Sequence, residues 1–213
     1  ITKPETEVKY TGFVHELFEG SWKSDKNKEA TINAQFQTLV EKARTNNITD
    51  LIVVRDTSGS MGSSCPGTKM TCYDVAKALA LYFSEFLTGT FQNHWIEFNS
   101  DAKLQTWVGQ TPVDKWKNDR SSYVGGTNFQ SVVNLFAKMK KEGTPEADFP
   151  SGILCISDSE FNPTQLDKTN VDTALQTLRN AGFSKQYVYN FVIVLWNLQS
   201  RAYGGAGDKF ETG

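Results

Sequence analysis

The amino-acid sequence predicts an α/β domain: a doubly wound, Rossmann-like, mostly parallel sheet with helices on both faces and one antiparallel edge strand. Short continuous apolar runs recur along the chain and are typical of strands covered on both faces. Segments with apolar residues at helical spacing alternate with these runs. Two strands near the middle are joined by a connection too short for a parallel crossover, so they should pair antiparallel. The alternation implies a mostly parallel sheet, and right-handed crossovers favour the doubly wound order.

The first half of the chain is expected to contain two helices and three strands. These are a helix over 29–43, a strand over 51–54, a helix over 71–87, and strands over 94–98 and 103–108. Thr71 and Asp74 have the spacing of a capping box at the start of the second helix. Residues 1–27 mix Lys, Glu, Gly and Ser and are expected to form an extended arm.

The second half continues the alternation after a polar loop. The expected elements are a helix over 129–139 that residues 125–128 open, a strand over 152–156, a helix over 170–182 and a strand over 187–196. We therefore expect an N-terminal arm and helix over 1–46, packed on a domain over 47–200. A polar, glycine-rich tail over 201–213 follows.

The composition indicates a soluble globular chain and disfavours some partners. With 213 residues, 38% hydrophobic, and a net charge of −2, the chain can bury one sizeable core. That charge balance offers no basic field to a nucleic acid, and no apolar run approaches the roughly 20 residues of a membrane span. The three cysteines favour a reduced, cytoplasmic compartment. Cys155 lies in an apolar strand, whereas Cys65 and Cys72 flank a short loop and could be bridged or share a metal.

Two acidic residues follow directly after expected strands. Asp56 follows the first strand and Asp158 follows the fourth. In a doubly wound sheet, ligands lie beyond the carboxyl ends of the strands where the strand order reverses, and that switch falls between these two strands. We therefore expect Asp56 and Asp158 to meet there, with Thr127 approaching from a neighbouring loop.

The two serines of the Asp-Thr-Ser-Gly-Ser stretch that begins at Asp56 complete a set of oxygen donors. Two carboxylates and three hydroxyls suit Mg²⁺ or Mn²⁺, whereas zinc prefers the His and Cys ligands missing from this set. Taken singly, Asp56 and Asp158 could be ordinary loop acids, and Thr127 could be a helix cap paired with Gln130. Their combination in this order favours a metal site.

Together these residues resemble the metal-ion-dependent adhesion site of von Willebrand factor A-type (vWA) domains, whose motifs are Asp-x-Ser-Gly-Ser-Met, a later Gly-Thr and a later strand-end Asp. All five signature positions match: Asp56, Ser58, Ser60, Thr127 and Asp158. The SGSM form, the SDSEF stretch at 157–161 and the Trp-Asn-Leu strand end at 196–198 are similar to the intracellular branch of that superfamily. That branch includes an uncharacterised family of plants, bacteria and viruses, which is itself like the A-type domain of the Ro autoantigen. The resemblance covers residues 10–196.

The resemblance implies that Ser58, Ser60 and Thr127 contact the ion directly, while Asp56 and Asp158 act mainly through water. One position then stays open for an Asp or Glu carboxylate of a protein partner. The implied function is a non-enzymatic, cation-dependent interaction domain without a membrane partner. The family also has a final strand and helix that the tail over 201–213 does not match.

Two other functions remain as alternatives. Ser60 could be a hydrolase nucleophile, because its surroundings resemble a nucleophile elbow in all but the first residue. A triad needs a histidine, and the chain has only His15, in the arm, and His94, at the end of a strand opposite the rim where Ser60 lies. The second alternative, an RNA-associated module by analogy with the Ro protein, rests on fold alone. Arg55, in an otherwise apolar strand, could pair with an acidic group near the site.

Overall fold

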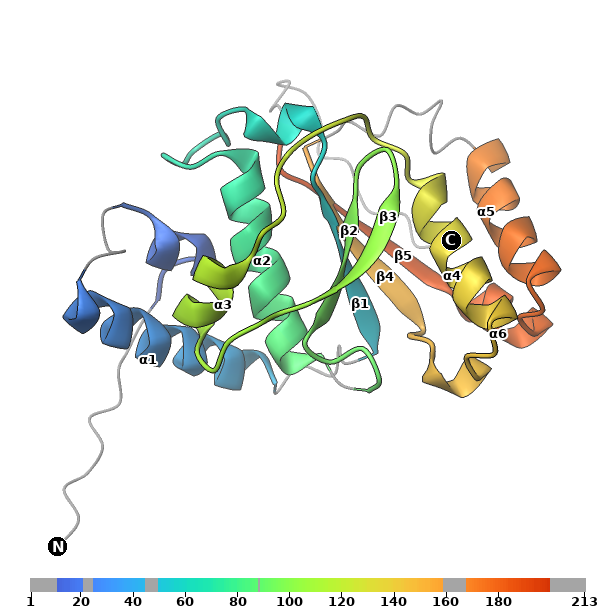
Figure 1. The fold of residues 1–213 in the computed structure, drawn as a ribbon, viewed down its shortest axis with the longest axis horizontal. Coiled ribbons are helices and arrows are strands. Elements are labelled where there is room, and N and C mark those ends of the chain that lie inside the picture. Colours follow the sequence, from blue (N-terminus) through green and yellow to red (C-terminus); the bar gives the residue numbers. More distant parts are fainter. Residues whose placement is uncertain (1–10, 21–24, 45–49, 88, 159–167, 200–213) are drawn as a thin grey trace, which may run out of the picture.

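A five-stranded sheet forms the centre of the molecule (Figure 1). The computed structural model describes residues 11–20, 25–44, 50–87, 89–158 and 168–199. The strands are β1 Leu51–Asp56, β2 His94–Phe98, β3 Ala102–Thr106, β4 Gly152–Ser157 and β5 Val192–Asn197. Their order is β3-β2-β1-β4-β5, and every neighbouring pair is parallel except β2 and β3. The prediction of a mostly parallel α/β sheet with one antiparallel edge strand is therefore confirmed.

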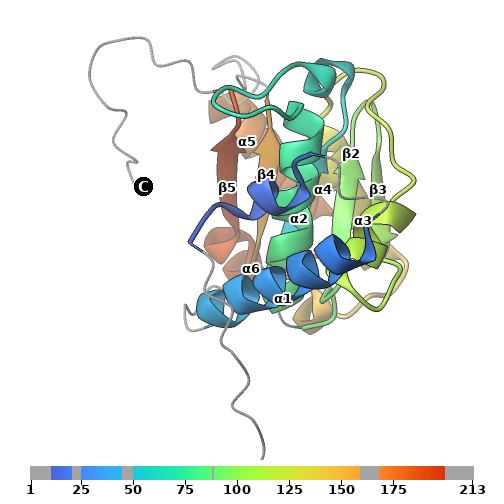
Figure 2. The same ribbon diagram turned by 90° about the vertical axis from the view of Figure 1, so that its left-hand side faces the viewer.

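Helices cover both faces of the sheet (Figures 1 and 2). One face carries the 3₁₀ turn η1 (Val14–Phe18), α1 (Lys26–Ala43), α2 (Cys72–Phe86) and α3 (Pro112–Asn118). The other face carries α4 (Gln130–Lys141), α5 (Lys168–Asn180) and α6 (Lys185–Asn190). Two further 3₁₀ turns are η2 (Gly59–Gly62) and η3 (Glu146–Asp148). The helix α2 contacts β1 directly, and α1 packs against α2, α3 and η1.

Side chains of β1 alternate between two hydrophobic cores, as the pleat of a strand requires. Ile52 and Val54 belong to the core beneath α4 and α5, whereas Val53 belongs to the core beneath α2. Arg55 is two residues beyond Val53, on the same side of the strand, and it is fully buried. The strand therefore brings a charged side chain into an otherwise apolar layer.

The strand order reverses between β1 and β4. The chain passes from β1 to β2 and β3 on one side, and β4 and β5 extend the sheet on the other. The carboxyl ends of β1 and β4 share one edge of the sheet, and the loop between α3 and α4 runs along that edge (top of Figure 1). This is the place where a doubly wound sheet binds its ligands.

The prediction for the last strand is wrong in its first half. Residues 187–190 lie in α6, and the strand begins only at Val192. Ser184 caps α6 because its hydroxyl accepts the N–H of Tyr187 at 3.1 Å. A short apolar run is compatible with both helix and strand, and here the cap decides for the helix.

Three other boundaries differ from the sequence prediction. The helix α4 begins at Gln130 with Phe129 at its N-cap, so the interpretation of Thr127 as a helix cap is wrong. Residues 112–118 of the expected polar loop form α3, whose start is fixed by a capping box between Thr111 and Asp114. Within the expected arm, the buried turn η1 packs on α1 and α2. The tail over 201–213 lies outside the described residues.

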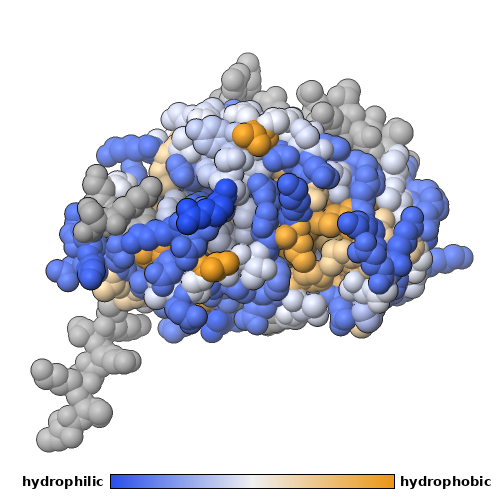
Figure 3. All heavy atoms as spheres, in the orientation of Figure 1, coloured by the Kyte–Doolittle hydropathy of each residue, from blue (hydrophilic) through white to orange (hydrophobic). Residues whose placement is uncertain are grey.

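Much of the surface is polar, with apolar surface between β3 and α4 (Figure 3), the elements that carry the half-buried Leu104, Leu135 and Met139. None of the helices in the described parts of the chain combines the length and apolar character that crossing a membrane requires. Cys65 and Cys72 are both free thiols. Thr71 caps α2, as its spacing to Asp74 predicts, by accepting the Asp74 N–H at 3.1 Å.

Candidate functional site

The end of β1 places a carboxylate in a fully buried position. Asp56 is 0% exposed. One of its oxygens accepts the backbone N–H of Ser58 at 2.7 Å, and the other accepts the hydroxyl of Ser157. These contacts turn the chain sharply out of the strand and into η2. The carboxylate is therefore held in one orientation at the edge of the sheet.

The two serines that follow Asp56 lie close to Asp158. The hydroxyl oxygens of Ser58 and Ser60 are 3.1 Å apart. The Ser60 hydroxyl also donates to Oδ1 of Asp158 at 3.0 Å, which joins the loop after β1 to the residue after β4 across 98 positions of sequence. The structure therefore brings Asp56, Ser58, Ser60 and Asp158 together, as the sequence predicts.

Thr127 lies on the loop between α3 and α4, and backbone hydrogen bonds hold that loop against the site. The N–H of Val124 donates to the carbonyl of Thr57 at 2.8 Å, and the N–H of Gly59 donates to the carbonyl of Gly125 at 3.0 Å. The N–H of Asn128 donates to the carbonyl of Asn99 at 2.7 Å. The Thr127 side chain is half-buried, and among the described contacts no hydrogen bond joins it to the other four residues. The loop is thus in place, while the threonine is not bonded to the group.

Gly125 shows why this loop needs a glycine. Its φ is +77°, a backbone conformation that residues with a Cβ rarely adopt. A Cβ added there would lie 2.8 Å from the Ser100 hydroxyl oxygen. That hydroxyl accepts the N–H of Gly126 at 3.0 Å, so the close approach also fixes the loop to the turn between β2 and β3.

The electrostatic state of the two carboxylates is unusual. Burial raises the pKa of Asp56, and the hydrogen bonds from Ser157 and Ser58 offset this only in part. Burial also raises the pKa of Asp158, the Ser60 hydrogen bond opposes this, and the nearby charge of Asp56 raises the pKa further. Among the residues that the structure describes, neither carboxylate has a Lys, Arg or His within ion-pair distance. The site therefore concentrates negative charge that the described part of the protein does not neutralise.

One distance between donor oxygens is compatible with a small divalent cation. Mg²⁺ is bound octahedrally with oxygens at about 2.0–2.1 Å, which sets neighbouring ligand oxygens about 3.0 Å apart. The Ser58 and Ser60 hydroxyl oxygens, 3.1 Å apart, match one edge of such an octahedron. The described residues contain no group of three or more His, Cys, Asp or Glu side chains that could hold a metal. An ion at this edge would therefore depend on hydroxyl oxygens.

Ser60 and His94 do not form the serine–histidine pair of a hydrolase. Ser60 follows the carboxyl end of β1, whereas His94 begins the parallel neighbour β2 and so lies at the opposite edge of the sheet. The His94 Nδ1 is 2.8 Å from the carbonyl oxygen of Gln92. The partners of the Ser60 hydroxyl are Asp158 and Ser58.

Two features of the site were missed by sequence reasoning. Ser157 bonds Asp56, and its position next to Asp158 at a strand end was a usable signal. Asp119 is the acidic partner of Arg55, at 2.9 Å, and no spacing in the sequence connects two residues 64 positions apart.

Comparison with known proteins gives a family for most of the chain. A family model described as "Domain of unknown function (DUF7788)" matches residues 50–209. The matched range includes β1, the loop after it, the α3–α4 loop and β4, and so all five candidate residues. No curated protein matches the chain.

Proposed function

Because the chain belongs to the DUF7788 family, a domain family of unknown function, we propose a function from the site itself. The domain is a non-enzymatic interaction module that binds Mg²⁺ or Mn²⁺ and, through the ion, an acidic side chain of a protein partner. Its metal residues are Asp56, Ser58, Ser60, Thr127 and Asp158. It is a vWA-type domain whose metal-ion-dependent adhesion site lies at the switch point of the sheet.

The observation that carries the proposal is the pairing of two buried carboxylates with two hydroxyls at octahedral spacing. Removing a carboxylate from water without a positive partner costs free energy, and a bound cation offsets that cost. Asp56 and Asp158 are 0% and 5% exposed, and the Ser58–Ser60 oxygen separation is 3.1 Å. The charge and the ligand atoms therefore both favour a divalent cation.

The contacts of the two serines and two aspartates support the roles that we propose for them. Ser58 and Ser60 present neutral oxygens, and Asp158 accepts a hydrogen bond from Ser60, so the serine hydroxyl is oriented by the carboxylate behind it. Asp56 is oriented by Ser58 and Ser157 in the same way. With the aspartates acting mainly through water, three neutral hydroxyls leave the ion's charge available to a partner carboxylate.

One carboxylate on one ion does not make a specific complex, so the surface around the site must contribute. Tyr123 and Val124 lie on the loop beside the site and are 48% and 55% exposed. The Val124 N–H is bonded to the carbonyl of Thr57, and the Tyr123 ring packs against Tyr73. These apolar side chains are held in place before a partner arrives, which lowers the entropic cost of binding.

The proposal is tested by thermal unfolding in EDTA and in millimolar Mg²⁺, Mn²⁺ or Ca²⁺. A ligand that binds only the folded state stabilises it by about 2.7 kcal/mol at a hundredfold excess over its dissociation constant. We expect Mg²⁺ and Mn²⁺ to raise the Tm of the wild-type protein and to leave Asp56→Ala unchanged.

Asp101→Asn is the matched control. Asp101 is an exposed carboxylate in the turn between β2 and β3, at the same edge of the sheet, and its loss should leave the cation response intact. A wild-type protein that shows no shift at saturating concentrations of any of these cations contradicts the proposal. Equal loss of the response in Asp56→Ala and Asp101→Asn points instead to nonspecific surface charge.

A further inference from the structure

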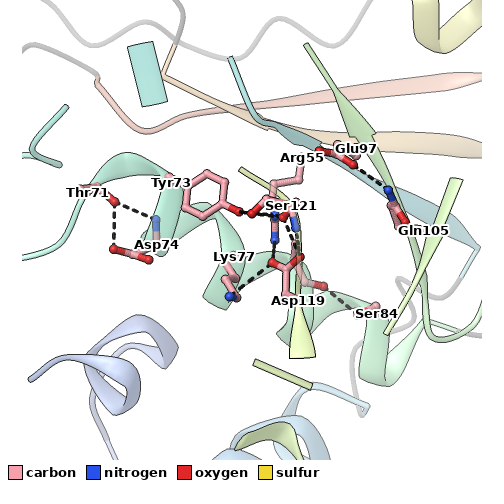
Figure 4. Close-up of polar contacts among 11 residues, drawn as sticks. Arg55, Thr71, Tyr73, Asp74, Lys77, Ser84, Glu97, Gln105, Asp119 and Ser121 are labelled. Atoms are coloured by element: carbon pink, nitrogen blue, oxygen red, sulfur yellow. Dashed lines mark hydrogen bonds and ion pairs between the residues drawn. The ribbon is translucent and has the colours of Figure 1, made fainter. Parts of the chain in front are cut away.

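A buried charged cluster surrounds Arg55 (Figure 4). Because successive side chains of a strand alternate between faces, Arg55 lies on the opposite face of β1 from Asp56. Arg55 is the largest fully buried side chain in the described residues. Its guanidinium carbon is 4.0 Å from the centroid of the Trp95 ring and 4.9 Å from that of Tyr73. Aromatic faces stabilise a desolvated cation, but these contacts alone do not explain why an arginine occupies this position.

The guanidinium of Arg55 binds the first residues after α3. Its Nη1 donates to Oδ2 of Asp119 at 2.9 Å, and its Nη2 donates to the Ser121 hydroxyl and to the Tyr73 hydroxyl, the latter at 3.3 Å. Lys77 approaches the same Asp119 oxygen at 3.4 Å. Burial favours a raised pKa for Asp119, but the two cations and the hydrogen bonds from Ser121 hold its pKa below the ordinary value.

Asp119 and Ser121 are themselves joined. The Ser121 hydroxyl donates to Oδ1 of Asp119 at 2.6 Å, and the Ser121 N–H donates to the same oxygen at 3.0 Å. The Tyr73 hydroxyl donates to the Ser121 carbonyl at 2.5 Å. Both the side chain and the backbone of this short segment are therefore fixed against β1 and α2.

The hydrogen bonds of Arg55 are concentrated on the segment that begins at Asp119, and not all of its donors are used. The Nε of Arg55 is buried without a hydrogen-bond partner among the described residues, whereas both terminal nitrogens are used on the residues around Asp119 and Ser121. Buried ion pairs are often no more stabilising than apolar side chains of the same volume, so stability alone does not account for this one. The planar fork of arginine fixes two partners in one geometry, which a lysine cannot do.

The segment so fixed leads directly into the loop that carries Thr127. The upstream end of the loop is held at Asp119 and Ser121 by Arg55, and the downstream part is held at Val124 and Gly125 by the residues after Asp56. Arg55 and Asp56 are consecutive in β1. The end of this one strand therefore positions Asp56 and also contacts the segment that leads to Thr127.

We infer that Arg55 is a positioning residue for the candidate metal site, acting through Asp119 and Ser121 to hold the Thr127 loop against Asp56. The inference rests on the proposed function, because only an ion makes the position of Thr127 matter. None of the cluster residues would touch the ion. Weakening the cluster should loosen the loop and lower ion affinity without removing any ligand atom.

The test compares two serine-to-alanine variants in the full chain. Ser121→Ala removes one hydroxyl of the cluster and leaves the Arg55–Asp119 pair in place. Ser84→Ala is the control, because it also removes one hydroxyl, from a buried serine on α2, whose bonds among the described residues go only to the carbonyls of Ala80 and Leu81. The first readout is hydrogen exchange of the Val124, Gly126 and Asn128 amides, which are bonded to Thr57, Ser100 and Asn99. The second is Mn²⁺ affinity, measured by electron paramagnetic resonance of the free ion.

We expect exchange at the three amides to be at least about threefold faster in Ser121→Ala, and unchanged in Ser84→Ala. We expect the Mn²⁺ dissociation constant to rise about tenfold, the lower end for residues that orient metal ligands. Tyr73→Phe, which removes another hydroxyl bonded to Ser121, should act in the same direction.

The outcomes separate the inference from the function. Unchanged exchange and unchanged Mn²⁺ affinity in both Ser121→Ala and Tyr73→Phe, with a wild-type protein that binds Mn²⁺, overturn the positioning role. Equal changes in Ser84→Ala also overturn it, because the effect would then be general loosening. A wild-type protein that binds no Mn²⁺ overturns the proposed function, and the exchange rates then decide whether the cluster contacts of Ser121 hold the loop at all.

Discussion

The two sides of β1 carry buried charges in two different settings. On the α2 side, Arg55 and Lys77 pair with Asp119, and the hydroxyls of Tyr73 and Ser121 accept further hydrogen bonds from Arg55. One residue later, Asp56 and its neighbour Asp158 receive hydrogen bonds only from neutral donors. The directions of the pKa shifts express the difference, since the pKa of Asp119 is lowered and those of Asp56 and Asp158 are raised.

The comparison separates a carboxylate that cations of the described chain neutralise from two carboxylates that lack such a partner there and for which we propose a cation. In the cluster, two cations of the described chain neutralise the charge of Asp119, so removing one partner should be costly. Two buried carboxylates without a cationic partner among the described residues cost the folded state free energy, and the proposed cation would offset that cost. Experiments that change one setting and not the other can break this distinction.

The largest expected effect is the loss of the partner of Arg55. Asp119→Asn leaves two buried cations without a carboxylate, and breaking a buried pair in this way costs about 3–5 kcal/mol. Urea unfolding at neutral pH measures it. Glu142→Gln is the control, because the Glu142–Lys138 pair is exposed, with side chains 62% and 70% accessible, and such pairs contribute at most about 1 kcal/mol. Equal costs in the two variants would mean that Asp119 is not part of a compensated cluster.

A smaller effect of opposite sign is expected at the candidate site. In EDTA, Asp56→Asn removes an uncompensated charge and keeps an oxygen acceptor for the Ser58 N–H. The free energy of unfolding should therefore rise, by about 1 kcal/mol, the size of one ordinary hydrogen-bond or desolvation difference. In saturating Mg²⁺ the wild-type protein should have the higher free energy of unfolding, because the ion stabilises the wild type and not the variant.

If Asp56→Asn is destabilised in both EDTA and Mg²⁺, the Asp56 carboxylate stabilises the fold as Asp119 does, and the contrast between the two is wrong. The variant also separates charge from shape, since asparagine and aspartate have nearly the same size. Asp158→Asn offers an independent check, because burial also raises the pKa of Asp158 and an asparagine oxygen can still accept the Ser60 hydrogen bond.

Sequence reasoning located one of these two settings and not the other. Asp56 and Asp158 could be predicted as neighbours because both follow parallel strands, and parallel strands end at one edge of the sheet. Arg55 stood out in an apolar strand, but the chain has 24 acidic residues, and only tertiary packing selects Asp119 among them. The ends of parallel strands can be located in a sequence, whereas the partner of a buried side chain depends on how the loops pack.

The same limit applies to secondary structure. The strands β1 and β4 were predictable because each contains a short continuous apolar run. The helix α6 was not, because Tyr187, Val188 and Phe191 are spaced like a strand or a helix, and its start depends on the Ser184 cap. The sequence placed Thr127 on a loop, as the structure shows. It did not predict that α4 begins only at Gln130, because that start depends on how the loop packs.

The smallest expected effect, a difference in pH dependence, tests the comparison without assuming a ligand. The pKa of Asp119 is lowered from 3.8 in the folded protein, so its contribution to stability is present above that pH and is lost as the pH falls through the folded value. The pKa of Asp56 is raised from 3.8, so the folded state holds this proton more tightly than the unfolded chain does. Stability from this group is therefore lost as the pH rises from 3.8 through its folded value.

Urea unfolding in EDTA from acidic to neutral pH measures both pH dependences of the unfolding free energy. The gain in unfolding free energy of Asp56→Asn over the wild type should grow as the pH rises above 3.8, whereas the deficit of Asp119→Asn should be complete there and shrink only below 3.8. Added Mg²⁺ should abolish the first trend, because the ion binds the ionised carboxylate, and leave the second untouched. Parallel pH profiles for the two variants would show that the charges on the two sides of β1 are compensated alike, and the contrast between them would not hold.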